Sequence, residues 1–194
     1  DPGSAHLLEA YIPDEGRHIA NAISNNTAIF ASDGSYQPNL STDLGTGAWV
    51  LQCTATQATA RGVCQTTGPP EDINAYRSEF QALHEAVKAI ELICTRWKVT
   101  EGSITGGIDC INVQRFATSD ERKVPQQMKH SDIAREIRQL NHRLPSASTT
   151  STLKRTLTPK TAFEQDHPSR SSTSSVTAWP KLTSTDSLTT MAAP

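Results

Sequence analysis

The sequence has no apolar run that approaches the roughly 20 residues needed to cross a bilayer, and its first residues lack the charged-then-apolar pattern of a signal peptide. It also lacks a strong charge imbalance: the formal net charge of the 194 residues is -2, which argues neither for nor against nucleic-acid binding. The chain starts with Asp1 rather than Met. We therefore expect an intracellular protein, in the cytoplasm or nucleus, that has no membrane partner and is a fragment cut from a larger polyprotein.

Cysteine is scarce, and none of the four cysteines belongs to a Cys-x-x-Cys pair. The scattered spacing argues against a zinc site and against a disulfide framework. We expect Cys53, Cys64, Cys94 and Cys110 to be reduced thiols of the core.

Large apolar residues become rare after Pro145. Residues 146–194 are close to half Ser and Thr and show no sustained hydrophobic period, so this segment cannot bury enough apolar surface to offset chain entropy. We predict a tail that is disordered or frameshifted. Residues 1–27 are also uninformative and are interpreted as a leader, the end of a preceding domain, in which "HLLEAYI" can form one short helix.

Residues 28–145 carry the patterns of a folded domain. Runs of strand-forming residues bounded by turn residues at hairpin spacing predict an antiparallel meander, followed by a long helix whose apolar residues recur in steps of three and four. Asp72 is a candidate N-cap of this helix. The predicted strands cover residues 28–32, 46–52, 60–65 and 102–110, and the predicted helices cover residues 71–97, 111–117 and 131–144.

Three carboxylates fall at positions where burial would be costly. Asp33 follows an apolar run at the end of the first predicted strand, Asp109 ends the fourth, and Glu79 lies on the core-facing side of the long helix. Clustered carboxylates become favourable around a divalent cation, because Mg2+ and Mn2+ prefer hard oxygen ligands. Taken singly, Asp33 also fits a simple turn and Glu79 a rim position. Together they predict a metal site.

The order of these features resembles the ribonuclease H domain, and is most similar to the type carried by reverse transcriptases of retroelements. The motifs are "FASDGSY", a Gly-x-Gly hairpin strand, "YRSEFQAL" on the helix and "GIDC" at the fourth strand. The resemblance covers residues 28–144. It implies an α/β fold with a five-stranded mixed sheet, whose first three strands are antiparallel, and helices on its faces. It also implies that Asp33, Glu79 and Asp109 match the first three acidic metal ligands of the family.

The resemblance further implies an endonuclease that uses Mg2+ or Mn2+ to hydrolyse RNA in RNA-DNA hybrids. In this family two ions activate a water and stabilise the leaving 3'-oxygen, and a hybrid is recognised by backbone shape and 2'-hydroxyls. The expected partners are the hybrid and other domains of a reverse transcriptase polyprotein. The alternative is a degenerate, catalytically inactive remnant with at most weak nucleic-acid binding.

Residues 110–144 are locally basic, which fits contacts to phosphates or a solvated helix face equally well. Seven Lys and Arg residues (Arg115, Arg122, Lys123, Lys129, Arg135, Arg138, Arg143) stand against four acids (Asp120, Glu121, Asp132, Glu136). Within this stretch, His130, Ser131 and Asp132 are triad residue types, but sequence neighbours rarely meet in triad geometry. We interpret Ser131 as a helix N-cap and Asp132 as a complement to the helix dipole.

The resemblance stops at Pro145. The family pattern requires a fifth strand, a catalytic His and a last helix with a fourth acidic ligand, and residues 146–194 match none of these. With permissible codons, a shift of two nucleotides turns residues 147–159 into "IHHIYVEAHTDA" and residues 174–182 into "ICDSLAKA". We therefore predict a frameshifted tail, and we expect the chain as written to bind a divalent ion weakly and to cleave hybrids poorly or not at all.

Overall fold

The computed structural model describes residues 7–118, 124–125 and 127–144, so the predictions for the Ser/Thr-rich tail lie outside the described residues. These described residues belong to one compact unit. Its elements are β1 (Leu7–Tyr11), η2 (Pro13–Gly16), α1 (Arg17–Ser24), β2 (Ala28–Tyr36), β3 (Gly45–Cys53), β4 (Thr59–Gln65), η3 (Pro70–Asp72), α2 (Ala75–Trp97), β5 (Ile104–Ile108), α3 (Ile111–Thr118) and α4 (Ser131–Arg143).

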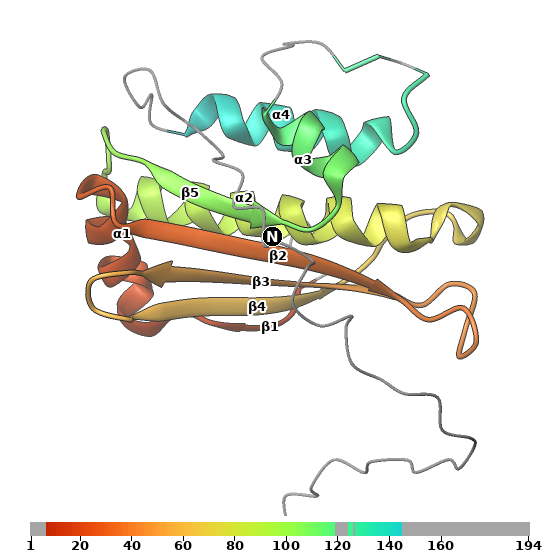
Figure 1. Ribbon diagram of the computed structural model, residues 1–194, viewed down its shortest axis with the longest axis horizontal. Coiled ribbons are helices and arrows are strands. Elements are labelled where there is room, and N and C mark those ends of the chain that lie inside the picture. Colours follow the sequence, from red (N-terminus) through yellow and green to blue (C-terminus); the bar gives the residue numbers. More distant parts are fainter. Residues whose placement is uncertain (1–6, 119–123, 126, 145–194) are drawn as a thin grey trace, which may run out of the picture. The chain divides into compact units, whose positions relative to one another are not determined.

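The strands form one mixed sheet in the order β1-β4-β3-β2-β5. Strands β1, β4, β3 and β2 pair antiparallel, whereas β5 pairs parallel to β2. Figure 1 shows the strands side by side in this order, with α2 behind the sheet and α3 and α4 on the side of β5. The expected α/β class and mixed five-stranded sheet are confirmed: β2, β3 and β4 are the three predicted antiparallel strands, β5 is parallel to β2, and β1 adds a fourth antiparallel strand at the edge.

Strand β2 shows why one face of the sheet is covered. Ala28, Phe30 and Ser32 are buried and alternate with exposed residues, as the period of two of a half-buried strand requires. The buried face packs against α2, whose apolar residues at helical spacing supply the other half of the core: Phe80, Leu83, Val87, Ile90 and Cys94. These five side chains belong to the face that the sequence pattern predicts.

Helix α2 begins one turn later than the sequence pattern indicates. Asn74 is its N-cap, and the Asn74 side chain accepts a hydrogen bond of 3.0 Å from the backbone N–H of Arg77. Asp72 ends the preceding turn η3. The prediction of an Asp72 cap is therefore wrong, because the short turn places Asn74 beside the free N–H groups of the first helical turn.

The backbone of α2 lies directly on the sheet. A Cβ atom added to Gly34 would lie 2.3 Å from the backbone nitrogen of Glu79, and one added to Gly47 would lie 2.9 Å from the Cα atom of Ala82. Gly34 and Gly47 are paired across β2 and β3. Only glycine at this pair leaves room for the helix, so two neighbouring positions without side chains set how closely the helix and the sheet approach.

Residues of the expected leader contribute to this sheet and core. The short helix expected in "HLLEAYI" is wrong: β1 pairs with β4 at the edge of the sheet. Pairing satisfies backbone groups that such a short isolated helix would leave largely exposed. Helix α1 buries Ile19, Ala20, Ala22 and Ile23 in the same hydrophobic core as α2. The domain boundaries at residues 27 and 145 stay predictions.

The cysteines are free thiols, as their scattered spacing in the sequence predicts. Cys53, Cys64 and Cys94 are buried, Cys110 is partly buried, and all four are free thiols. In the part of the chain that the structure describes, no helix is both long and apolar enough to span a membrane.

Replacing Gly34 with Ala tests the contact between helix and sheet. We expect Gly34→Ala to lower the free energy of unfolding by about 3 kcal/mol, because the new methyl group would overlap the backbone of α2. The matched control is Gly107→Ala on the neighbouring strand β5, where a Cβ would meet only the carbonyl oxygen of Phe30 at 3.7 Å. Urea denaturation measures both variants. Equal stability of the two would contradict the proposed role of the close approach.

Candidate active site

Two of the predicted site residues lie on neighbouring strands. Asp33 is part of β2, and Asp109 directly follows β5. The parallel register pairs Ser32 with Ile108, so the next residue of each strand lies at the same level. Both aspartates are exposed. Because laterally neighbouring residues of a sheet face the same side, the register brings Asp33 and Asp109 together although they are far apart in sequence.

Glu79 reaches the same region from the first turns of α2. The Gly34 contact brings the backbone of Glu79 against β2, immediately beside Asp33. The backbone of Gly34 lies close enough to the Glu79 carboxyl group to favour its charged form. One carboxyl oxygen, Oε2, is buried and has no hydrogen-bond partner among the described residues. A buried acceptor without a partner is costly. Among the three predicted ligands, Glu79 is the one with such an atom in the described part of the chain.

The electrostatics of Glu79 include contributions from both aspartates. Burial, then the negative charge of Asp33 and, less strongly, that of Asp109 together raise the pKa of Glu79 to about 7, against the opposing effect of the Gly34 backbone. Such a raised pKa is typical of carboxylates that share a site. Near neutral pH, Glu79 is therefore poised between its charged and neutral forms.

The chemistry of the donor set fits a hard cation, although the side chains are not arranged around one. Within the described ranges, no three His, Cys, Asp or Glu side chains form a group that could hold a metal ion as they stand. The unpartnered Oε2 atom of Glu79 and the exposed carboxylates of Asp33 and Asp109 nevertheless are all oxygen donors of the kind that Mg2+ and Mn2+ prefer. Their role as metal ligands stays a prediction.

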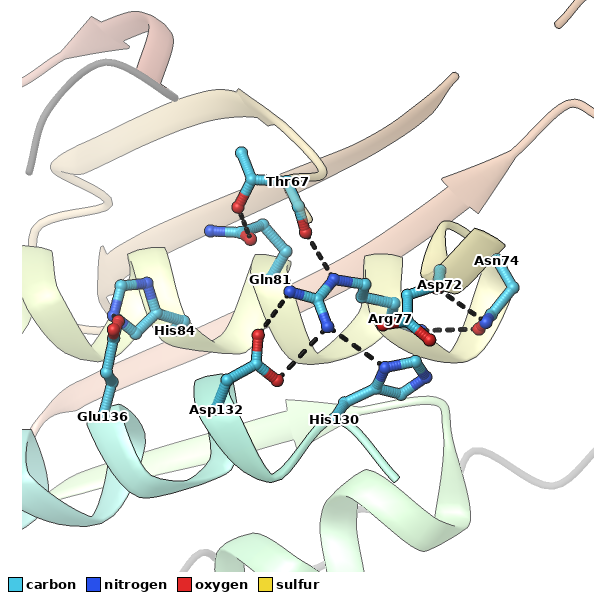
Figure 2. Close-up of polar contacts among 9 residues, drawn as sticks. All are labelled: Thr67, Asp72, Asn74, Arg77, Gln81, His84, His130, Asp132 and Glu136. Atoms are coloured by element: carbon cyan, nitrogen blue, oxygen red, sulfur yellow. Dashed lines mark hydrogen bonds and ion pairs between the residues drawn. The ribbon is translucent and has the colours of Figure 1, made fainter. Parts of the chain in front are cut away.

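A polar network on the other side of α2 was not anticipated (Figure 2). The Arg77 guanidinium binds the carboxylate of Asp132 through two hydrogen bonds of 3.2 and 2.5 Å, and binds Nδ1 of His130 at 3.2 Å. Arg77 Nε donates to the backbone carbonyl oxygen of Thr67. The sequence pattern marks His130 and Asp132 as triad residue types and Asp132 as a complement to the helix dipole, and nothing in it indicates Arg77 as their partner.

The start of α4 differs from the expected cap. Ser131 is the first residue of the helix rather than its N-cap, so that prediction is wrong. The N-cap is His130, which has a left-handed backbone (φ 59°) and makes no side-chain capping bond. Asp132 lies in the first turn as expected, where its charge complements the helix dipole, and it also pairs with Arg77.

His130 is held in its neutral form by its surroundings. A guanidinium can only donate, so Nδ1 of His130 accepts from Arg77 and its proton is carried on Nε2. Burial, followed by the positive charges of Arg77 and Lys129, lowers the pKa of His130. Nε2 is buried without a hydrogen-bond partner in the described part of the chain. His130 therefore acts as an uncharged acceptor for Arg77 near neutral pH.

The basic stretch is partly engaged inside the protein. The Arg138 guanidinium lies 4.3 Å from the centroid of the Phe116 ring, and Arg138 donates a hydrogen bond to the Phe116 carbonyl oxygen. Arg143 lies 3.7 Å from Glu91 of α2. Arg122 and Lys123 lie outside the described residues. Two of the basic side chains thus stabilise the packing of α4, and contacts of the others to phosphates stay a prediction.

Comparisons with known proteins do not assign the chain to a family. No family model and no curated protein matches the chain. Among solved structures, it is similar to the N-terminal RNase H domain of a Mycobacterium tuberculosis protein solved as a fusion with maltose-binding protein, with 11% identity, a TM-score of 0.41, and 60% of this chain and 79% of that chain covered. It is also similar to RNase H1 from the halophilic archaeon Halobacterium salinarum, with 14% identity, a TM-score of 0.37, and 62% and 79% covered. Values this low do not by themselves assign the chain to a family.

The raised pKa of Glu79 predicts how stability depends on pH. Its folded-state pKa of about 7 exceeds the ordinary value of 4.5, so the folded state holds a proton that the unfolded state has lost between these pH values. Stability that is fully present below pH 4.5 is therefore lost as the pH rises through 7. We expect Glu79→Gln to stabilise the protein at pH 8 by about 1 to 2 kcal/mol, after allowance for solvent screening.

Urea denaturation at pH 4 and pH 8 checks this expectation. Glu101→Gln, at an exposed glutamate outside the helices and strands, is the control and should change little at either pH. A Glu79→Gln variant that gains no stability at pH 8 would contradict the crowding of the three carboxylates.

Proposed function

We propose that this chain is a ribonuclease H-like, divalent-metal-dependent endonuclease that hydrolyses RNA in RNA-DNA hybrids and derives from a retroelement reverse transcriptase polyprotein. The observation that carries the proposal is the placement of Asp33, Glu79 and Asp109 by two neighbouring strands and a helix, with the pKa of Glu79 raised by burial and then by the other two carboxylates. Repulsion among three neighbouring carboxylates destabilises a site that is merely structural. The same group of carboxylates becomes favourable when a cation is bound among them.

The strand order supports the same assignment. The resemblance implies three antiparallel strands followed by a strand beside the first, and β2, β3, β4 and β5 follow this arrangement. The parallel pairing of β5 with β2 brings Asp109 next to Asp33. A topology that separated these strands would have removed the basis of the site.

Asp33, Glu79 and Asp109 would hold Mg2+ or Mn2+, which would activate water and stabilise negative charge on the phosphodiester. Asp33 and Asp109 offer solvent-exposed carboxylates. Glu79 offers a buried oxygen that has no other partner among the described residues. Because the pKa of Glu79 lies near 7, ligation would require loss of its proton, and binding of the ion should strengthen as the pH rises through this value.

A second candidate is the inactive remnant, and particular features favour it. Among the described strands, β5 has β2 as its single neighbour, so one edge of the sheet is open. The face of the sheet away from α2 exposes Ile29, Val50 and Val63. No described residue supplies a fourth carboxylate to the group. A site with this composition would bind a cation weakly and would not complete hydrolysis.

Thermal unfolding with added cations tests the metal site independently of catalysis. Mg2+ or Mn2+ should raise the unfolding temperature of the wild-type chain, because a ligand that binds only the folded state stabilises it by about 2.7 kcal/mol at 100 times its dissociation constant. Asp33→Asn, Glu79→Gln and Asp109→Asn should each abolish most of this increase. Asp43→Asn, at an exposed residue of the β2–β3 hairpin that bonds to Ser41, should retain it. An equal response in all four variants would exclude the proposed ligands.

Cleavage of a labelled RNA-DNA hybrid separates the two candidates. We expect the chain as written to cleave poorly or not at all, and a version with the frame restored after Pro145 to recover metal-dependent cleavage that Asp33→Asn removes. Circular dichroism confirms that the folded concentrations are equal. If the restored chain is also inactive, the endonuclease proposal fails; if the chain as written is equally active, the fourth ligand is unnecessary.

A further inference from the structure

Arg77 is a cation enclosed by the protein. Its side chain is 3% exposed, whereas the side chain of its partner Asp132 is 58% exposed. The β4–α2 connection closes over the guanidinium, because a Cβ at Gly68 would lie 2.6 Å from Arg77 Nε. Gly68 has a φ of +135°, a conformation that favours glycine. Burying a charged side chain is costly, and a salt bridge can form at the surface without that cost. The burial of Arg77 therefore needs an explanation other than its pairing with Asp132.

The contacts of Arg77 join three separate segments (Figure 2). Nε binds the carbonyl oxygen of Thr67 before α2, and the two terminal nitrogens bind His130 and Asp132 at the start of α4. The planar fork of arginine can serve these acceptors together, whereas a lysine ammonium cannot match them in one plane. The first turns of α2 are therefore held in a defined rotation and height relative to α4 and to the connection from β4.

Glu79 follows Arg77 by two residues, so the two side chains project from roughly opposite sides of α2. Arg77 faces α4, and Glu79 lies against Gly34 of β2. A rotation or shift of this turn would move the Glu79 carboxyl group away from the Gly34 backbone and from Asp33. We propose that Arg77 is a positioning residue, whose buried hydrogen bonds to Thr67, His130 and Asp132 hold Glu79 beside Asp33.

This inference deepens the proposed function and rests on it in treating Glu79 as a ligand. It also accounts for the triad residue types at the start of α4: His130 and Asp132 act on Arg77 rather than forming a triad with Ser131. Arg77 does not contact the cation in this account. It acts through the helix, as residues that orient metal ligands do.

The test compares Arg77→Lys with Arg143→Lys in the full chain. Arg143 also joins α4 to α2, but it pairs with Glu91 near the other end of the long helix, so it controls for a general loosening of the two helices. The first readout is the amide resonance of Gly34, which lies against Glu79 and is sensitive to the position of its carboxyl group, with Glu79→Gln as the reference for a changed carboxyl group. The second readout is Mn2+ affinity measured by calorimetry.

We expect Arg77→Lys to move the Gly34 amide resonance toward its position in Glu79→Gln and to weaken Mn2+ binding about tenfold, while Arg143→Lys leaves both unchanged. If Arg77→Lys does not fold, Asp132→Asn supplies the same comparison, because it weakens the fork and keeps the contacts to Thr67 and His130. A folded variant with wild-type Gly34 resonance and wild-type affinity would overturn the proposal. If the wild-type chain binds no Mn2+, the metal-site proposal fails, and the Gly34 resonance still tests whether Arg77 positions Glu79.

Discussion

The close contact between the backbone of α2 and the paired glycines Gly34 and Gly47 is the constraint on which the rest of the structure depends. It sets the spacing between helix and sheet, and the larger side chains of α2 then fill the core farther along the helix. The same contact forces Glu79 against β2, next to Asp33. Packing and the candidate chemistry therefore have one origin: a helix lies so close to the sheet that its first turns deliver a carboxylate to the strands.

Burying the Glu79 carboxylate is energetically costly, and its surroundings favour the protonated form. Burial and the neighbouring acids raise the pKa of Glu79, and one of its oxygens has no partner in the described part of the chain. On the other side of the helix, Arg77 is buried with its hydrogen bonds made to His130, Asp132 and Thr67. The satisfied network stabilises the turn that holds the unsatisfied carboxylate, an arrangement typical of functional sites.

Sequence reasoning succeeded where a signal is local and repeated. The steps of three and four in residues 71–97 predict α2, and runs bounded by turn residues predict β2, β3 and β4. It failed where a few residues depend on distant partners. β1 is a strand because β4 offers an edge, and the starts of α2 and α4 depend on the turns that precede them, which place Asn74 and His130 at the caps. Such short segments contain too few residues for a hydrophobic period, so their structure cannot be predicted from the local sequence.

The residue types and order of the candidate site were evident from the chain, because Asp33 and Asp109 end apolar runs and Glu79 interrupts an apolar helical face. Which of them meet was decided by the parallel register of β5 on β2 and by the approach of α2 at Gly34. The pairing of Arg77 with His130 and Asp132, across more than fifty positions of sequence, likewise exists only in the folded chain. Hydrophobic period is a property of neighbouring residues, whereas hydrogen bonds and charge repulsion depend on distance in space.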